Sequence, residues 1–225
     1  MFLTLLFSSP LLGLVWLVAI LLSLTIHEFS HAFVGGLLGD KTAEREGRLS
    51  LNPLAHLDLI GFIPLLLFGF GWAKPVPFNP YNLKNPKWDS VSIALAGPAA
   101  NLALAIISAA GFRLTSASLG SFNALTVFFF LLILLNLFLL FFNVIPIHPL
   151  DGSKLFFALF DQPQYARLRA FVAIRGPQIL MIAVFVAILT NIDVFFFIAA
   201  PAYRTCDALT GKTCLDYFSS LFATL

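Results

Sequence analysis

Two histidines and a glutamate near the end of an apolar segment are the residues of this sequence best suited to chemistry. They lie in the string His27-Glu28-Phe29-Ser30-His31. In a helix, residues four apart share a face, so the two imidazoles can hold one zinc ion together. The glutamate between them can act as general base toward a metal-bound water. Ionisable side chains in a lipid-length segment are costly, and they are therefore candidates for function.

A third ligand is expected, because a catalytic zinc usually has three protein ligands and one open position. Asp151 is the best candidate, in a proline-rich segment over residues 143–152. Irregular backbone followed by Gly152 can point an acid into a helical bundle. The alternative is that Asp151 caps a helix beginning near Ser153. His148 is a rival ligand, and it could instead support the site or lie at the membrane interface.

Two asparagines in apolar spans, Asn101 and Asn143, each allow two interpretations. Asn101 follows Gly97 in the string GPAAN, inside an apolar span, where its amide needs a hydrogen-bond partner. It could bind a substrate backbone or stabilise an oxyanion. It could equally join two helices, with Gly97 allowing their close approach. Asn143 has the same ambiguity, whereas a surface or turn role is expected for His56.

The composition predicts an integral membrane protein. The chain has 225 residues, of which 60% are hydrophobic and only 11% are charged, and its mean hydropathy is +0.95. Soluble domains are usually about 25% charged. The formal net charge of +2 is too small to suggest a nucleic-acid partner. The start of the chain has no basic region or cleavage site, so we expect its apolar run to be a retained helix.

The elements that must position these residues are apolar segments of membrane length. We expect spans at residues 11–38, 91–112, 122–145 and 171–200, the last being one helix or a helix broken near 191–193. Glycines and prolines over residues 59–86 predict a re-entrant or interfacial element with strand-like pieces. A short apolar segment follows the third span at 151–160, and the tail over 201–225 is expected to be interfacial.

Basic residues predict the orientation. They concentrate in two places, the connection after the first span and the one after the third, whereas Arg113 stands alone between the second and third spans. Basic residues favour the cytoplasmic side. The zinc motif and the connection at 146–170 should therefore lie at the same, cytoplasmic, end of the membrane. At the other end of the chain, Cys206 and Cys214 form a bridge if the tail faces an oxidising compartment, or else remain two thiols.

The order of these motifs resembles the site-2 protease family of zinc intramembrane proteases. The likeness rests on HEFSH at 27–31, GPAAN at 97–101, and the segment from NVIP at 143–146 to PLDG at 149–152. The stretches at 52–61 and 71–77 also resemble the connecting region of that family. The likeness covers about residues 20–160 in the correct order, and the chain looks like a compact member without a PDZ insertion.

The resemblance implies a mostly α, polytopic membrane protein with a helical bundle around one zinc per chain. His27, His31 and Asp151 would be the ligands, Glu28 the base, and Asn101 a catalytic residue near the bound peptide. The region 59–86 would be a membrane-associated strand element beside the substrate path. His148 departs from the usual motif, where a non-ionisable residue is commoner.

The resemblance implies an endopeptidase that cuts membrane-protein substrates in or near their transmembrane segments within the lipid bilayer. We expect a single integral membrane domain over 1–225, with a catalytic core at about 11–160 and C-terminal helices and tail at about 161–225. A metal-ion transporter is one alternative, although the third and fourth apolar regions hold almost no ligands. A catalytically inactive membrane scaffold is the other, and the intact Glu28 argues against it.

Overall fold

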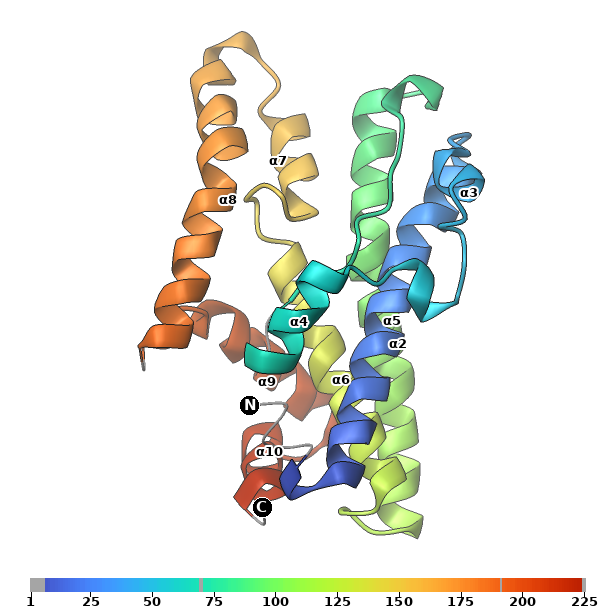
Figure 1. Ribbon diagram of the computed structural model, residues 1–225, viewed down its shortest axis with the longest axis vertical. Coiled ribbons are helices and arrows are strands. Elements are labelled where there is room, and N and C mark those ends of the chain that lie inside the picture. Colours follow the sequence, from blue (N-terminus) through green and yellow to red (C-terminus); the bar gives the residue numbers. More distant parts are fainter. Residues whose placement is uncertain (1–6, 69–70, 191, 224–225) are drawn as a thin grey trace.

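The computed structural model describes residues 7–68, 71–190 and 192–223, and this part of the chain is a mostly α, multi-pass bundle (Figure 1). Four helices or helical stretches are long and apolar enough to cross a membrane. They are α2 (Pro10–Leu37), α5 (Pro86–Ser118), α6 (Ala124–Asn143) and the stretch Pro163–Leu189, which contains α8 (Ala166–Leu189). The predicted spans are confirmed, and the second proves longer than expected at both ends.

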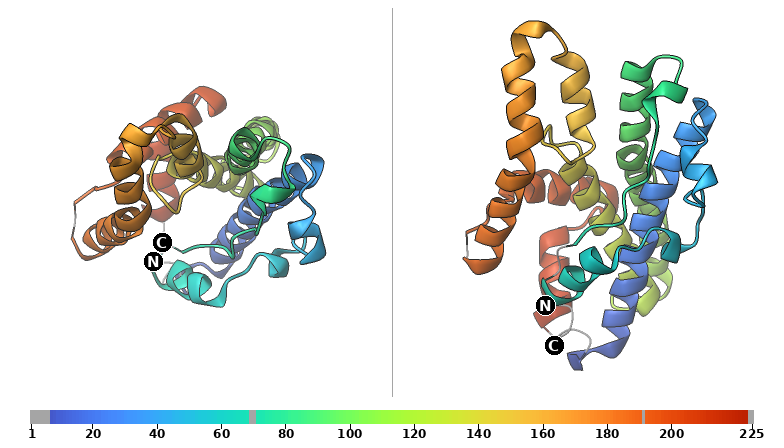
Figure 2. Two further views of the ribbon diagram at one scale, coloured as in Figure 1. Left: turned by 90° about the horizontal axis from the view of Figure 1, so that it is seen from above. Right: turned by 45° about the horizontal axis from the view of Figure 1, so that its top comes forward.

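The core is formed by α2, α5 and α6, which pack side by side over most of their length (Figures 1 and 2). Its centre is made of fully buried apolar side chains, among them Phe112, Phe130, Ile133 and Leu137. Apolar packing alone selects no unique register in lipid, where hydrocarbon tails compete with side chains. Buried amides add direction: Asn136 of α6 donates to the hydroxyl of Ser23 on α2 at 2.8 Å.

The connection from α2 to α5 contains α3 (Thr42–Arg45), η1 (Pro53–Ala55), α4 (Leu59–Phe68) and η2 (Pro80–Asn82). The expectation of irregular structure at 59–68 is wrong. Asp58 starts α4 by accepting the Ile60 amide at 3.0 Å, and the helix then continues through Pro64. The cap at Asp58 and the apolar sequence of α4 stabilise the helix by more than the missing amide of Pro64 costs.

Residues 71–79, called the strap below, are extended and run beside α2 toward the start of α5 (Figure 2). The predicted strand pieces are wrong in one respect. No residue of the described chain is in a β-ladder. Within the strap, Pro75 and Pro77 have no amide to donate to one. The strap is instead bonded to side chains and single carbonyls of its surroundings.

The C-terminal part contains α7 (Gly152–Leu159), η3 (Pro163–Tyr165), α8, α9 (Phe196–Thr210) and α10 (Cys214–Ala223). The fourth apolar region is broken, since α8 ends at Leu189 and α9 begins at Phe196. Asn191, where the break is expected, lies outside the described residues. α8 is peripheral: only 11% of its apolar window is buried, against 39–50% in the other three.

The tail packs into the bundle more than an interfacial segment would. Ala202, Cys206 and Tyr217 all belong to the main apolar core, and α9 lies against α6. Cys206 and Cys214 form a disulfide, which decides between the two readings of the cysteines. This disulfide lies at the end of the bundle that holds the α5–α6 turn, where Tyr217 donates its hydroxyl to the Ser121 carbonyl.

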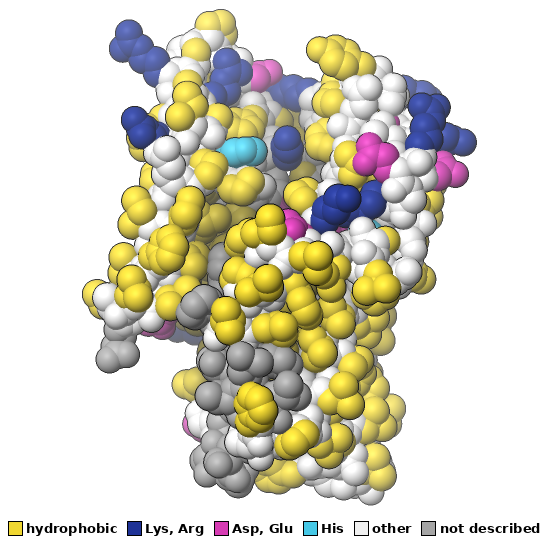
Figure 3. Space-filling view, in the orientation of Figure 1, with side chains coloured by type: hydrophobic (Ala, Val, Ile, Leu, Met, Phe, Trp, Pro, Cys, Tyr) yellow, Lys and Arg dark blue, Asp and Glu magenta, His cyan; other side chains and the backbone are white. Residues whose placement is uncertain are grey.

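Charged side chains gather at the opposite end of the molecule, around the hollow between the α7–α8 arm and the α3–α5 arm (Figure 3). That end carries the connection from α2 to α5 and the one from α6 to α8. The basic residues of these two connections and of the adjoining parts of α5 and α8 are Lys41, Arg45, Arg48, Lys74, Lys84, Lys87, Lys154, Arg167, Arg169 and Arg175.

Candidate metal centre

The two motif histidines face one another on α2, as their spacing predicts. Their Nε2 atoms are 3.0 Å apart, and the side chains are buried, with His27 5% and His31 8% exposed. These two and Glu28, all buried within two helical turns, are the ionisable side chains of a helix whose other polar side chains are hydroxyls. A helix of ordinary geometry therefore delivers both imidazole nitrogens to a single point.

Asp151 reaches the same point from the loop between α6 and α7. Its Oδ2 lies 3.3 Å from Nε2 of His27 and 3.4 Å from Nε2 of His31. A Cβ at Gly152 would overlap the Val144 carbonyl, so glycine is what lets this loop fold back on the end of α6. Asp151 precedes α7 but makes no side-chain cap bond, which excludes the capping alternative.

The helix α5 supports the histidines from behind with one face, made of Ile93, Gly97 and Asn101. The Ile93 carbonyl accepts from Nδ1 of His31 at 2.7 Å, and the Asn101 amide lies 3.1 Å from Nδ1 of His27. Gly97 sits between them, and a Cβ there would come within 2.5 Å of His31 Nε2. The next residue, Pro98, has no amide for the helix and loosens the same turn.

Glu28 is held by the strap. Its Oε2 accepts the Val76 amide at 3.2 Å, and the carboxylate is 9% exposed. Val76 offers the sole amide of its tripeptide, because it stands between Pro75 and Pro77. The position of Glu28 thus depends on where the strap lies.

The strap is fixed on both sides of Val76. The Lys74 amide donates to the His56 carbonyl at 2.8 Å, and the buried Arg48 guanidinium donates to the Lys74 carbonyl. Beyond Val76, the Asn79 amide donates to Asp40 at 2.6 Å. These two attachments keep the intervening residues over Glu28.

Asp40, just past the end of α2, is the acceptor that ties together the turn, the strap and η2. Burial raises the pKa of Asp40, but bonds from Thr42, Asn82 and the Asn79 amide outweigh it and hold the pKa below its usual value. Its side chain is 2% exposed. Asp40 is therefore charged at neutral pH and structurally required in that form.

The residues fit a zinc ion. In the described chain, one group of three potential ligands is close enough to hold a metal: His27, His31 and Asp151, with ligand atoms all within 4.8 Å. Two imidazole nitrogens and one carboxylate oxygen are a common ligand set of catalytic zinc. Asp151 Oδ2 is enclosed yet has no hydrogen-bond partner among the described residues, as expected of an atom that serves a metal.

The rival histidines lie elsewhere. His148 is half-buried against Phe157, with its carbonyl close to Gly176 of α8, and it is not part of the ligand group. Burial, and then the Lys154 ammonium, lower the pKa of His148. His56 has the expected turn role, since its Nε2 donates to the Ser50 carbonyl at 2.7 Å. It is buried, however, and not at the surface.

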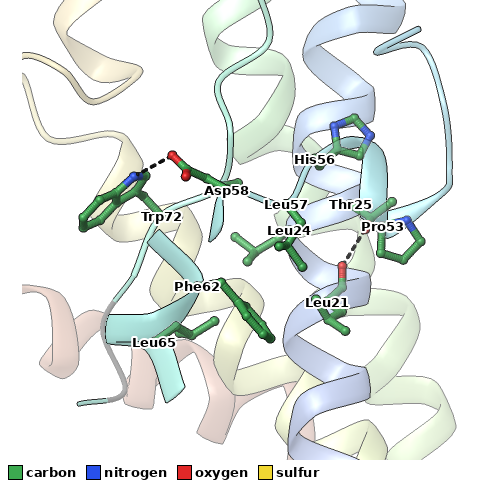
Figure 4. A pocket seen from close by; sticks show the side chains of 11 residues that line it. Leu21, Leu24, Thr25, Pro53, His56, Leu57, Asp58, Phe62, Leu65 and Trp72 are labelled. Atoms are coloured by element: carbon green, nitrogen blue, oxygen red, sulfur yellow. Dashed lines mark hydrogen bonds between the residues drawn. The ribbon is translucent and has the colours of Figure 1, made fainter. Parts of the chain in front are cut away.

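A small pocket lies beside the site, between α2, η1, α4 and the start of the strap (Figure 4). Its volume is about 310 Å³, part of it open to solvent. Leu21, Leu24 and Phe62 make it largely apolar, and the Trp72 indole closes one side by donating to Asp58 at 3.0 Å. The ligand group is not part of its lining.

Sequence reasoning missed three polar contacts, of which two support the site and one, that of Asn136, joins α6 to α2. Asn136, an amide in the middle of the Leu- and Phe-rich third span, could have been found from its burial cost. The carbonyl of Ile93 and the amide of Val76 are backbone groups, for which side-chain patterns give no signal. Asn143, which was singled out, bonds only the Leu139 carbonyl of its own helix.

Comparison with known proteins agrees with this geometry. Residues 117–189 match the family described as Peptidase family M50, and the match includes Asp151. No solved structure matches this chain.

Two proteins similar to this chain carry names that state an activity. Putative zinc metalloprotease YwhC of Bacillus subtilis is 43% identical over 143 residues, which are 61% of this chain and 65% of the relative. Putative zinc metalloprotease Rip2 of Mycobacterium tuberculosis is 34% identical over 138 residues, which are 59% of this chain and 52% of the relative. The chain thus spans 65% and 52% of the lengths of these two relatives.

Proposed function

We propose that this chain is a zinc-dependent endopeptidase that hydrolyses peptide bonds in or near transmembrane segments of membrane proteins. The observation that carries the proposal is the meeting of His27, His31 and Asp151 beside Glu28 in an apolar span. At a rise of about 1.5 Å per residue, His27 lies about 15 Å along α2 from its end at Leu37. That is about half the thickness of a hydrocarbon core, so a peptide bond that reaches the site lies at membrane depth.

Each residue has a defined part in peptide hydrolysis. A zinc ion held by His27, His31 and Asp151 would supply Lewis acidity, polarising the scissile carbonyl and lowering the pKa of a water. Glu28 takes one proton from the attacking water and gives it to the leaving amine nitrogen. Water thereby adds to the carbonyl carbon as the C–N bond breaks. The Val76 amide donates to the Glu28 carboxylate and holds it in place beside the ligands.

The strap limits how a substrate can pair with it. A peptide that adds to an extended segment normally exchanges amides and carbonyls with it. In the strap, the amides of Lys74, Val76 and Asn79 are already bonded within the protein. Pro75 and Pro77 have no amide. An unwound peptide would therefore pair mainly with strap carbonyls, donating its own amides.

A substrate helix must unwind before cleavage, because its carbonyls are otherwise bonded within the helix. We expect helix-breaking residues near the scissile bond to favour cleavage. Water must also reach the ligands, and we propose that it enters from the hollow at the charged end of the molecule (Figure 3). Asp151 is the most open ligand, with 20% of its side chain exposed.

We propose that this charged end faces the cytoplasm. Two observations support the orientation independently. The two connections at that end hold most of the basic residues, as cytoplasmic connections do. The Cys206–Cys214 disulfide lies at the other end, and disulfides persist in oxidising compartments.

The test is cleavage of model transmembrane peptides by the purified full chain, with products mapped by mass spectrometry. We expect cuts within or next to the apolar segment, loss of cutting with a zinc chelator, and faster cutting when a helix breaker precedes the bond. Glu28→Gln is the matched control for a contaminating protease. Equal cleavage by Glu28→Gln, or no cleavage of any peptide by the zinc-loaded chain, would count against the proposal.

A further inference from the structure

Both motif histidines present Nε2 to the ligand point, which sets a condition on their other nitrogen. Nε2 can bind a metal only if it carries no proton, and a neutral imidazole then carries its proton on Nδ1. Each Nδ1 must therefore donate to an acceptor. The partner of Nδ1 decides whether the ring is prepared for a metal.

For His31 this condition is met by the backbone. Its Nδ1 lies 2.7 Å from the Ile93 carbonyl, which can only accept. The proton is therefore on Nδ1, and the lone pair of Nε2 points at the Asp151 carboxylate. The α5 helix thus sets the tautomer of one ligand without using a side chain.

For His27 the partner is Asn101, whose amide can donate or accept. With the amide nitrogen 3.1 Å from Nδ1, the amide would donate, and Nε2 would have to carry the proton. That proton would point at Nε2 of His31, 3.0 Å away. At the same time Asn101 Oδ1 is left without a partner, although the side chain is fully buried.

Turning the amide over meets the condition. The oxygen and nitrogen of an amide occupy nearly equivalent positions, so hydrogen-bond chemistry decides which of them faces the ring. With Oδ1 toward His27, the oxygen accepts from Nδ1–H and is no longer unpaired. Nε2 of His27 is then free of its proton.

We propose that Asn101 is a positioning residue for the metal centre: its Oδ1 accepts from Nδ1–H of His27 and keeps Nε2 available to zinc. The inference rests on the zinc site of the proposed function. Ile93 and Asn101 are eight residues apart on one face of α5. Each would then accept a hydrogen bond from the Nδ1 atom of one histidine, Ile93 from His31 and Asn101 from His27. Gly97, midway between them, leaves the space that both rings need.

The position of Asn101 argues against direct contact with a substrate. The side chain is 0% exposed and lies on the Nδ1 side of His27, away from the Nε2 atoms that face Asp151. A role for Asn101 in binding peptide is therefore replaced by a role in holding a ligand.

The test is the zinc dissociation constant of the full chain in detergent or lipid nanodiscs, measured by competition with a chromophoric chelator. Asn101→Leu keeps the size and removes the acceptor, and we expect it to bind zinc roughly 10–100-fold more weakly. Asn101→Asp keeps an acceptor but cannot donate, and we expect its affinity to stay within about threefold of wild type. Asn136→Leu is the matched control, an equally buried amide on α6 that touches no ligand, and its zinc affinity should not change.

Three results would overturn the inference while leaving the zinc site in place: unchanged affinity in Asn101→Leu, equal weakening in Asn101→Asp, or equal weakening in Asn136→Leu. If Asn101→Leu does not fold, the zinc affinity of Asn101→Asp still decides. Weakened affinity would mean that the site needs a donor at this position, and unchanged affinity would mean that it needs an acceptor. Failure of wild type to bind one zinc would instead overturn the proposed function, and this inference with it.

Discussion

Gly97→Ala should damage the metal centre through one added methyl group. The new Cβ would lie 2.5 Å from His31 Nε2 and 2.6 Å from His27 Cε1, whereas ordinary contacts begin at 3.4 Å. The rings or the helix must therefore move by about 0.9 Å, and zinc ligand distances tolerate only about 0.2 Å. We expect zinc affinity to fall by at least about 10-fold and cleavage to fall with it.

The matched control is Gly111→Ala on the same helix. Its Cβ would meet the Phe129 ring at 2.6 Å, a clash of similar size, but about 21 Å from Gly97 along α5. Both changes replace glycine by alanine within a helix, so the gain in helix propensity of about 1 kcal/mol is common to both. Overpacking at Gly111 should cost about 1–3 kcal/mol of stability and leave zinc affinity unchanged.

The assay is chelator competition for zinc on both variants, with thermal unfolding of the metal-free protein measured in parallel. We expect Gly97→Ala to lose zinc affinity and Gly111→Ala to keep it, while both variants lower the thermal midpoint of the metal-free protein. Zinc affinity of Gly97→Ala within threefold of wild type would refute the claim that α5 approaches the ligands this closely.

Three further outcomes are expected. Glu28→Gln should keep zinc but slow peptide hydrolysis by roughly 10²-fold or more, because glutamine cannot accept the proton; near-normal cleavage with zinc bound would end the role of Glu28 as base. Cysteines placed at Lys84 and Arg167 should resist an impermeant maleimide applied outside intact cells, and strong labelling at either would reverse the topology. The lowered pKa of Asp40 means that its carboxylate contributes stability above about pH 3.9, the ordinary value, and that this is lost as the pH falls toward the lower folded pKa. The thermal midpoint of wild type should therefore drop more steeply below about pH 4 than that of Asp40→Asn, and parallel curves would contradict this.

The three candidate ligands could be predicted from the sequence because each leaves a strong local signal. Residues four apart on a helix must share a face, so His27 and His31 are fixed relative to each other by spacing alone. Asp151 follows from counting spans, since two crossings return the chain to the same end of the bundle. The capping alternative could be rejected only from the side-chain contacts of Asp151.

The contacts that hold the candidate ligands and Glu28 in place could be predicted less well, because they join residues that are far apart in the sequence. The Val76 amide meets Glu28 across 48 positions of sequence, and the Ile93 carbonyl meets His31 across 62. Backbone groups are the same at every residue, so no composition signal marks them. The helix at 59–68 is not predicted, because its glycines and its proline argue against regular structure and its cap at Asp58 gives a weaker signal. The tail is predicted at the interface, because its burial against α6 depends on tertiary packing.

The most direct test of the account is a cycle of zinc removal and return on the purified full chain, with peptide cleavage and zinc content measured in the same sample. We expect chelation to abolish cleavage, one zinc per chain to restore it, and Asp151→Asn to regain neither zinc nor activity. Cleavage that persists after complete zinc removal, or full zinc content in Asp151→Asn, would contradict the assignment of His27, His31 and Asp151 as the centre of a zinc protease.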